Sequence, residues 1–362
     1  MKIAYLNTSF NEKSIGGGST HIREFINHVT ALGHTIYVGE YNYHPKAIQI
    51  DEKIFPRIKT LLQCDVVYTR YEGKMTDSML LNQFPLKQLT QHAVNIWEFN
   101  TLPQLALTKG KDEDEVDRQI KLLRKESAIS DMAVCVSETM ADYVKSVLKW
   151  KKVLVIPNGS NPDHFKPGLK ISERMTYFEE NFNIVWAGSL EMEWSDTELL
   201  IKTAEKFWAS GYKNFHFHLI GRHPMFLSKR IPPNVSLYGS QPYRDLPNWL
   251  SGMDIGLILY KDRIANYGSP IKLFDYLSNG LAVISTQHPQ VKKILSEIGF
   301  DDFVLNDDSS DELFEKIMKL STEEELLGVF KENARKLINE KYNWGTSMTK
   351  LLNEIELLVN AK

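Results

Sequence analysis

Short apolar segments alternate with helical segments along most of the chain, and this alternation limits the possible folds more than any other feature. In the first half, strands are predicted at "KIAYLNT", "HTIYVGE", "DVVYTRY", "AVNIWEF" and "AVCVSE". In the second half, they are predicted at "NIVWAGS", "FHFHLIG", "NVSLYG", "DIGLILY" and "LAVIST". Strands that alternate with helices favour parallel sheets covered on both faces. The pattern therefore predicts two doubly wound α/β domains, with ligands bound at the carboxyl ends of the strands.

The two halves of this pattern are separated by the segment "PNGSNPDHFKPG", residues 157–168, which contains three prolines and two glycines. Such a segment interrupts regular structure, so we predict the domain boundary there. This assigns residues 1–165 to an N-terminal domain and residues 166–340 to a second domain. A length of 362 residues agrees with about two domains.

Composition excludes several classes of protein. A net charge of −3 gives no global attraction to nucleic acid, and no stretch approaches the ~18 apolar residues that a membrane span needs. The first residues lack the basic start of a signal peptide, and Cys64 and Cys135 lie in apolar runs that suggest buried thiols. We therefore expect a cytoplasmic protein. Trp150, among three lysines, allows peripheral contact with an anionic membrane, although a solvated helix end is the favoured interpretation.

The most informative short stretch is "NYGSPIKLFDYLSNGLAVIST", residues 266–286. Ser269 fits a helix N-cap, Pro270 fits the first helical position, and the free N–H groups of this helix start favour an anion. Lys272 in the first turn suits a phosphate, and Asp275 could accept hydrogen bonds from ribose hydroxyls. The combination suggests a nucleoside diphosphate. A solvated ion pair between Lys272 and Asp275 is the alternative.

A second glycine-rich segment follows the first predicted strand. Gly16, Gly17 and Gly18 precede a helix with Ser19 as the expected N-cap. The later positions of a dinucleotide fingerprint are filled by Thr20 and His21, so that motif is not supported. Three glycines still allow close approach of the backbone to a ligand.

Five segments, in order, resemble the GT-B glycosyltransferases, in particular the family-4-like group of retaining bacterial enzymes. The segments are "SIGGGSTHIREFINHVTALGHTIYV", "VNIWEFNTLP", "AVCVSETMADYV" with "KVLVIPNGSNPDHFKP", "NIVWAGSLEMEWSDTELLIKTA", and "PIKLFDYLSNGLAVIST". The closing "KYNWGTSMTKLLNEI" is similar to the family's last helix, which implies that residues 341–362 cross back to the N-terminal domain. Each motif is weak alone, but their order covers nearly the whole chain.

The resemblance implies a role for each matching position. Lys272 and the helix start would hold the diphosphate of a sugar nucleotide, and Asp275 its ribose. Glu98 could stabilise positive charge at the anomeric carbon, or act only as a structural cap, and His21 is more often a helix histidine than a catalyst. The other expected donor-side and loop residues are Ser269, Pro270, Ile271, Leu273, Gly188, Ser189, Arg222, Gly239, Ser240 and Tyr267, with Gly16, Gly17, Gly18 and Asn100 near donor or acceptor.

The sequence also departs from the family pattern. Tyr267 stands where most members have a glutamate, and the ribose residue is Asp275 rather than glutamate. The loop "GSLEMEWSD" carries neither the usual arginine nor the usual lysine for the phosphates, which leaves Lys272 as the main phosphate cation.

These features predict a glycosyltransferase that moves a hexose, most simply glucose from UDP-glucose, to a saccharide or lipid-linked acceptor in bacterial polysaccharide or glycoconjugate synthesis. Retention of configuration and independence of metals and cofactors are implied by the resemblance. The alternatives are a nucleotide-sugar epimerase of the same fold, a non-catalytic sugar-nucleotide-binding subunit and, last, a nicotinamide dehydrogenase.

Overall fold

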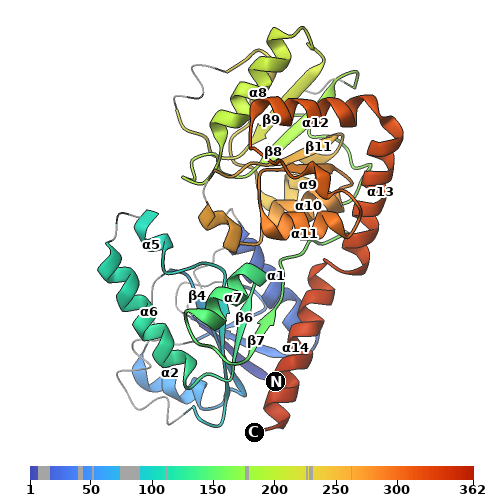
Figure 1. Ribbon diagram of the computed structural model, residues 1–362. Coiled ribbons are helices and arrows are strands. Elements are labelled where there is room, and N and C mark those ends of the chain that lie inside the picture. The colour runs from blue at the N-terminus through green and yellow to red at the C-terminus, as the bar shows by residue number, and fades with distance from the viewer. Residues whose placement is uncertain are drawn as a thin grey trace. The chain divides into compact units, whose positions relative to one another are not determined.

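The structure is a computed structural model that describes residues 1–6, 17–39, 44–50, 53–73, 90–108, 110, 112–175, 179–225, 227, 231–261 and 263–362. The chain divides into two compact units (Figure 1). Residues 1–158, 267–269 and 344–362 form the first unit, and residues 159–266 and 270–343 form the second. Each unit contains one parallel β-sheet, which confirms the expected α/β class.

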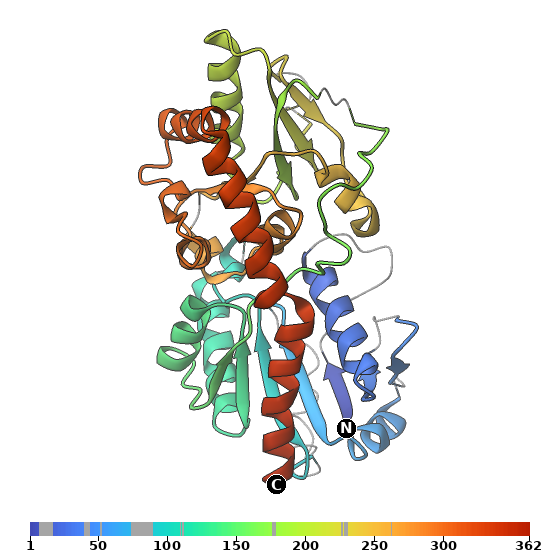
Figure 2. The same ribbon diagram turned by 90° about the vertical axis from the view of Figure 1, so that its right-hand side faces the viewer.

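The first unit contains a seven-stranded sheet in the order β3-β2-β1-β4-β5-β6-β7. Its strands are β1 (Lys2–Leu6), β2 (Thr35–Val38), β3 (Ile48–Gln49), β4 (Val66–Tyr71), β5 (Val94–Phe99), β6 (Met132–Cys135) and β7 (Val153–Val155). Its helices are α1 (Gly17–Ala31), α2 (Ile54–Leu61), α5 (Leu105–Thr108), α6 (Glu113–Ser127), α7 (Glu138–Ser146) and α14 (Trp344–Asn360). The last helix, α14, packs against α1 (Figure 2).

The second unit contains a five-stranded sheet in the order β10-β9-β8-β11-β12. Its strands are β8 (Phe182–Ala187), β9 (Phe215–Ile220), β10 (Val235–Leu237), β11 (Ile255–Ile258) and β12 (Ala282–Ser285). Its α-helices are α8 (Thr197–Ala209), α9 (Leu246–Leu250), α10 (Ile271–Ser278), α11 (Pro289–Ser296), α12 (Ser310–Thr322) and α13 (Glu324–Glu340). The described residues also include the 3₁₀ segments η2 (Tyr243–Asp245), η3 (Arg263–Tyr267) and η4 (Asp301–Phe303), of which η3 ends in the first unit.

Two helix starts differ from the sequence-based expectation. The first helix begins at Gly17, ahead of the predicted cap Ser19, and α10 begins at Ile271 with Pro270 in the N-cap position. Pro270 has an extended backbone, with φ −65° and ψ 110°, and no side chain caps the helix. Just beyond the end of α10, Gly280 adopts a positive φ of 76°, as glycines commonly do after a helix.

Trp150 does not lie at the surface. It is 3% exposed and packs edge-on against Phe99, with 5.1 Å between the ring centroids. The expectation that this indole could touch a membrane is therefore wrong, because the core of the first unit already covers it. Cys64 and Cys135 are buried free thiols, as the apolar runs around them indicated. None of the described helices is long and apolar enough to cross a membrane.

Candidate functional site

The order of strands in the second sheet creates a switch point between β8 and β11. After β8 the chain adds β9 and then β10 on one side, and afterwards adds β11 and β12 on the other side. The connections from the carboxyl ends of β8 and β11 therefore lead in opposite directions. In open α/β sheets, ligands bind in the crevice that this reversal leaves at the strand ends.

Two glycines allow the backbone to turn sharply at this edge. Gly188 follows β8 with a φ of 143°, and Gly221 follows β9 with a φ of 148°. A Cβ atom on Gly221 would lie 1.9 Å from the carbonyl oxygen of Gly188. The two loops can approach this closely only because Gly221 has no side chain.

Lys272, in the first turn of α10, reaches the same edge of the sheet. Its ammonium lies 3.7 Å from the centroid of the Trp186 ring and 5.6 Å from that of Tyr260. A Cβ atom on Gly188 would lie 2.9 Å from Nζ of this lysine. The lysine forms no ion pair with any residue that the structure describes, and burial lowers its pKa to about 7. The site therefore contains a cation without a counter-charge.

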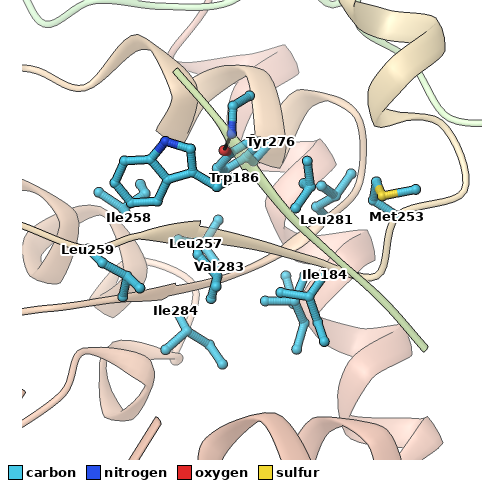
Figure 3. Packing of buried hydrophobic residues seen from close by; sticks show 14 of the residues in the cluster. Ile184, Trp186, Met253, Leu257, Ile258, Leu259, Tyr276, Leu281, Val283 and Ile284 are labelled. Atoms are coloured by element: carbon cyan, nitrogen blue, oxygen red, sulfur yellow. Dashed lines mark hydrogen bonds between the residues drawn. The ribbon is translucent and has the colours of Figure 1, made fainter. Parts of the chain in front are cut away.

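The core of the second unit holds these residues in place. Trp186 is the fifth residue of β8 and is 1% exposed, and its neighbour Ala187 donates its backbone N–H to the Tyr276 hydroxyl oxygen at 2.6 Å. Figure 3 shows Trp186 and Tyr276 among the apolar side chains that surround β11 and β12. Tyr276 itself packs on Gly256, where a Cβ atom would come within 2.2 Å of its ring. Strand β8 and helix α10 are thus fixed to each other beside the Lys272 ammonium.

Asp275, the expected ribose residue, points elsewhere. It is 2% exposed, and its Oδ1 accepts a hydrogen bond from the Ser160 hydroxyl at 2.7 Å. The alternative of a solvated ion pair with Lys272 is therefore wrong, because this carboxylate is buried in the second unit and contacts Ser160 instead. Its role toward a ribose stays a prediction.

The remaining donor-side candidates divide into three groups. At the strand ends lie Gly188, Ser189 and Gly239. The carbonyl of Gly239 accepts a hydrogen bond from the Gly221 N–H at 2.8 Å. On α10, Ile271 is half-buried, while Leu273 is fully buried and belongs to the core. Ser240 is exposed, and the Arg222 side chain is 68% exposed, with Nε 4.0 Å from the Glu191 carboxylate.

Ser269 and Tyr267 belong to the first unit rather than to the unit that contains Lys272. The Ser269 hydroxyl accepts a hydrogen bond from the Asn158 N–H at 3.1 Å instead of capping α10. The Tyr267 carbonyl accepts a hydrogen bond from the Ser137 hydroxyl at 2.7 Å, and its ring packs edge-on against Tyr143. The expectation of an N-cap at Ser269 is wrong, because Pro270 occupies that position in the chain.

The first unit contains a buried cluster of charged residues around Glu98. This residue is fully buried at the end of β5, and its carboxylate accepts hydrogen bonds from Tyr5 at 2.9 Å and from Arg70 at 2.8 Å. His21 Nε2 lies 2.6 Å from the same carboxylate, and the Asn100 amide donates to it as well. Burial by itself would raise the pKa of Glu98, but the charges of His21 and Arg70 outweigh it and lower the pKa to about 2.

Hydrogen bonds also hold the His21 ring between two partners. Asn158 donates its amide N–H to the Ser269 carbonyl, and its Oδ1 lies 2.8 Å from His21 Nδ1. His21 Nε2 lies 2.6 Å from the Glu98 carboxylate. Both ring nitrogens are therefore engaged within the first unit.

The roles of the other candidates in the first unit stay predictions. Gly17 and Gly18 form the start of α1, and Gly16 lies outside the described residues. Sequence reasoning did not find Arg70 or Trp186. Arg70 is the next-to-last residue of "DVVYTRY", and Trp186 lies near the end of "NIVWAGS". Polar or aromatic residues near the carboxyl ends of predicted strands were therefore the available signal. The part of the chain that the structure describes holds no cluster of three or more His, Cys, Asp or Glu residues suited to a metal ion.

Residues 181–323, which make up most of the second unit, match the family model "Glycosyl transferases group 1". No curated protein sequence matches the chain.

The whole chain also resembles solved GT-B structures. Sucrose-phosphate synthase from Thermosynechococcus elongatus has a TM-score of 0.75 at 14% identity, with all of both chains covered. A glycosyltransferase from Rickettsia africae has a TM-score of 0.71 at 15% identity, covering 100% of this chain and 99% of that one. HepE from Anabaena, in complex with UDP-glucose, has a TM-score of 0.71 at 12% identity, covering 98% and 99%. The expected GT-B fold is thereby confirmed.

Proposed function

We propose that the protein is a metal-independent GT-B glycosyltransferase that transfers a hexose, most simply glucose from UDP-glucose, to a saccharide or lipid-linked acceptor. The proposal includes retention of anomeric configuration and a role in bacterial polysaccharide or glycoconjugate synthesis, in the cytoplasm or at the inner face of the membrane. The observation that carries it is the Lys272 ammonium, which lies at the switch point of the second sheet with no counter-charge among the described residues.

The chemistry of the donor fits this site. A sugar nucleotide carries a diphosphate, whose negative charge would replace the missing partner of Lys272. The uncapped start of α10 offers backbone N–H groups to the same anion, and Gly188 places no side chain against the Lys272 ammonium. During transfer, charge develops on the leaving diphosphate, and a fixed ammonium would stabilise it.

The first unit is assigned to the acceptor. Its charged cluster of His21, Arg70 and Glu98 is held rigidly by hydrogen bonds at the ends of β4 and β5. Glu98 has no exposed surface, so any effect on the anomeric carbon would come from its charge or from its hold on His21. In this arrangement Glu98 does not serve as a proton acceptor, since its pKa of about 2 makes it a weak base.

Donor binding is tested by thermal unfolding with UDP, GDP, ADP, NAD and UDP-glucose. A ligand at about a hundred times its Kd adds roughly 2.7 kcal/mol to stability. We expect UDP and UDP-glucose to raise the midpoint, and Lys272→Ala to weaken both about 10- to 100-fold, the range for a lost hydrogen bond to a charged group. Lys292→Ala, which removes an exposed lysine from the next helix, is the matched control. A response to NAD alone would contradict the proposal.

The reaction class is tested by incubation with UDP-glucose and a panel of saccharide and lipid-linked acceptors, with and without EDTA. Transfer with retained configuration and no effect of EDTA is the expected result. Conversion of UDP-glucose to another UDP-sugar without an acceptor would instead indicate an epimerase. Binding without any turnover would indicate a non-catalytic subunit.

A further inference from the structure

The partner of Lys272 in this structure is an aromatic ring and not a carboxylate. Its ammonium lies 3.7 Å from the ring centroid of Trp186, and Tyr260 forms a second wall at 5.6 Å. The two rings meet edge-on, with 6.4 Å between their centroids. Trp186 comes from β8, Tyr260 follows β11, and Lys272 comes from α10, so three elements of one unit converge on a single cation.

From this geometry we propose that Trp186 is a positioning residue of the donor-phosphate site, whose ring holds the Lys272 ammonium in place while leaving its charge available to the diphosphate. The inference rests on the proposed function and identifies how that site is prepared for its ligand. Trp186 acts through Lys272 and does not touch the reacting atoms.

Elementary electrostatics explains why a ring suits this task better than a carboxylate. A neighbouring carboxylate would neutralise the ammonium and would have to be displaced by every incoming phosphate. The face of an indole attracts a cation through its quadrupole but carries no net charge. The ammonium is thus oriented before binding and remains unneutralised, which reduces the ordering that a ligand must impose.

The surroundings support an anchoring role for this indole. Trp186 is 1% exposed, and its Nε1–H finds no acceptor among the described residues, so hydrogen bonding does not explain its presence. Gly188 has no side chain, and a Cβ atom there would lie 2.9 Å from Nζ and 3.8 Å from Nε1 of Trp186. Because residue 188 is a glycine, no side chain at this position covers the Lys272 ammonium.

The ionisable groups beside the cation leave its charge uncompensated. Tyr260 and Tyr276 both have pKa values raised by burial, so their hydroxyls are neutral at physiological pH. Asp275, on the next turn of α10, is hydrogen-bonded to Ser160. The electrostatic environment of Lys272 is thus a neutral aromatic one.

The inference is tested with Trp186→Phe and Trp186→Leu by calorimetric titration with UDP, inorganic pyrophosphate and uridine. The leucine variant loses the ring, and we expect it to bind UDP and pyrophosphate about tenfold more weakly, within the range of desolvated cation–π pairs. The phenylalanine variant keeps a weaker ring, and we expect a loss of about threefold. Uridine binding should not change in either variant, because uridine has no phosphate.

Trp249 provides the matched control. It is 2% exposed in α9 of the same unit, and its Nε1 likewise has no acceptor among the described residues. Trp249→Leu should therefore show the same kind of packing loss in thermal unfolding without a selective loss of diphosphate affinity. Equal weakening of UDP and uridine by Trp186→Leu would assign Trp186 to packing and overturn the inference.

A second measurement avoids any change in side-chain shape. Tryptophan is replaced throughout by fluorinated tryptophan, which makes the ring face less negative, and pyrophosphate binding is measured. We expect weaker binding in the otherwise unaltered protein and no further change in Lys272→Ala. Unchanged binding in both would overturn the inference. Binding of pyrophosphate without preference for UDP would contradict only the proposed donor, so the two proposals can fail separately.

Discussion

The two units contain cations in opposite surroundings, buried in the first unit and half-buried in the second. In the first unit, His21 and Arg70 share the fully buried carboxylate of Glu98, and Arg70 also donates to Glu72 at 3.0 Å. In the second unit, Lys272 faces aromatic rings and forms no ion pair in the described part of the chain. In the cluster around Glu98 every charge has a partner within the protein, which suits a structural role. Lys272 has no such partner, which suits the binding of an anion. The predictions below test this contrast.

The largest effect is expected from removing the charge of Glu98. In Glu98→Gln, His21 and Arg70 would lose their shared counter-charge within a buried site. Breaking a buried ion pair from one side costs about 3–5 kcal/mol. The free energy of unfolding, measured by denaturant titration, should fall by about that amount. Glu72→Gln is the control, because the Glu72 side chain is 30% exposed, and its loss should cost about 1 kcal/mol or less. Equal effects of the two variants would contradict a cluster in which every charge has a partner.

The same carboxylate should also produce an acid limit of stability. The pKa of Glu98 is about 2 in the folded protein, below its ordinary value of 4.5, so the folded state binds the proton less readily than the unfolded state. This contribution to stability is present above about pH 4.5 and is lost as the pH falls toward 2. The difference in unfolding free energy between wild type and Glu98→Gln should shrink across that window. A difference that stays constant from pH 5 to 3 would show that Glu98 is not held ionised.

A smaller effect, a loss of donor affinity as the pH rises rather than falls, is expected at Lys272. Its pKa is about 7, below the ordinary 10.5, so without ligand it loses its proton as the pH rises above 7. A bound diphosphate favours the ammonium and raises this pKa, so binding should take up a proton near pH 8. The affinity for UDP-glucose should be level below pH 7 and fall about tenfold per pH unit above it, until the pKa of the complex is reached.

This proton uptake is measured by calorimetry in buffers of different ionisation enthalpy. UDP-glucose is preferred over UDP as the ligand because its diphosphate is esterified at both ends and keeps its charge in this range. Lys272→Met keeps the apolar stem and should abolish the uptake. Uptake that persists in Lys272→Met would assign the titration to another group.

The smallest effect is expected from Arg222, the exposed cation near the same strand ends. Its side chain is 68% exposed and only 4.0 Å from Glu191, so Arg222→Ala should change the free energy of unfolding by about 0.5 kcal/mol or less. UDP affinity should change far less than in Lys272→Ala. A comparable loss of affinity in both variants would show that Arg222 is a phosphate ligand and that the donor site has two cations.

Much of the fold followed from the pattern of residues. The apolar strand segments "NIVWAGS" and "FHFHLIG" became β8 and β9, because continuous apolar runs are stable only inside a sheet covered on both faces. Asp112 caps α6 by accepting the Glu115 N–H at 2.9 Å, a local interaction that an aspartate before a helix favours. Asp196 caps α8 in the same way, by accepting the Leu199 N–H at 2.9 Å.

Only part of the candidate site could be predicted from the sequence. Proximity along α10 suggested that Lys272 and Asp275 act together, but a difference of three residues leaves the side chains free to choose different partners. The Lys272 ammonium lies against the Trp186 ring, and the Asp275 carboxylate accepts a hydrogen bond from Ser160, which lies 115 residues away in the sequence. Glu98 and His21 were candidates from the sequence, but their contacts with each other and with Arg70 and Tyr5 could not be predicted, because these residues come from α1, β1, β4 and β5.

The sequence by itself determined the two parallel α/β units, their glycine turns and the presence of a lysine at the start of a helix, because these depend on periodicity and local backbone preference. The tertiary structure alone decided which charges are paired. That choice depends on contacts between residues far apart in the chain. His21 lies against the Glu98 carboxylate, whereas the Lys272 ammonium lies against the Trp186 ring.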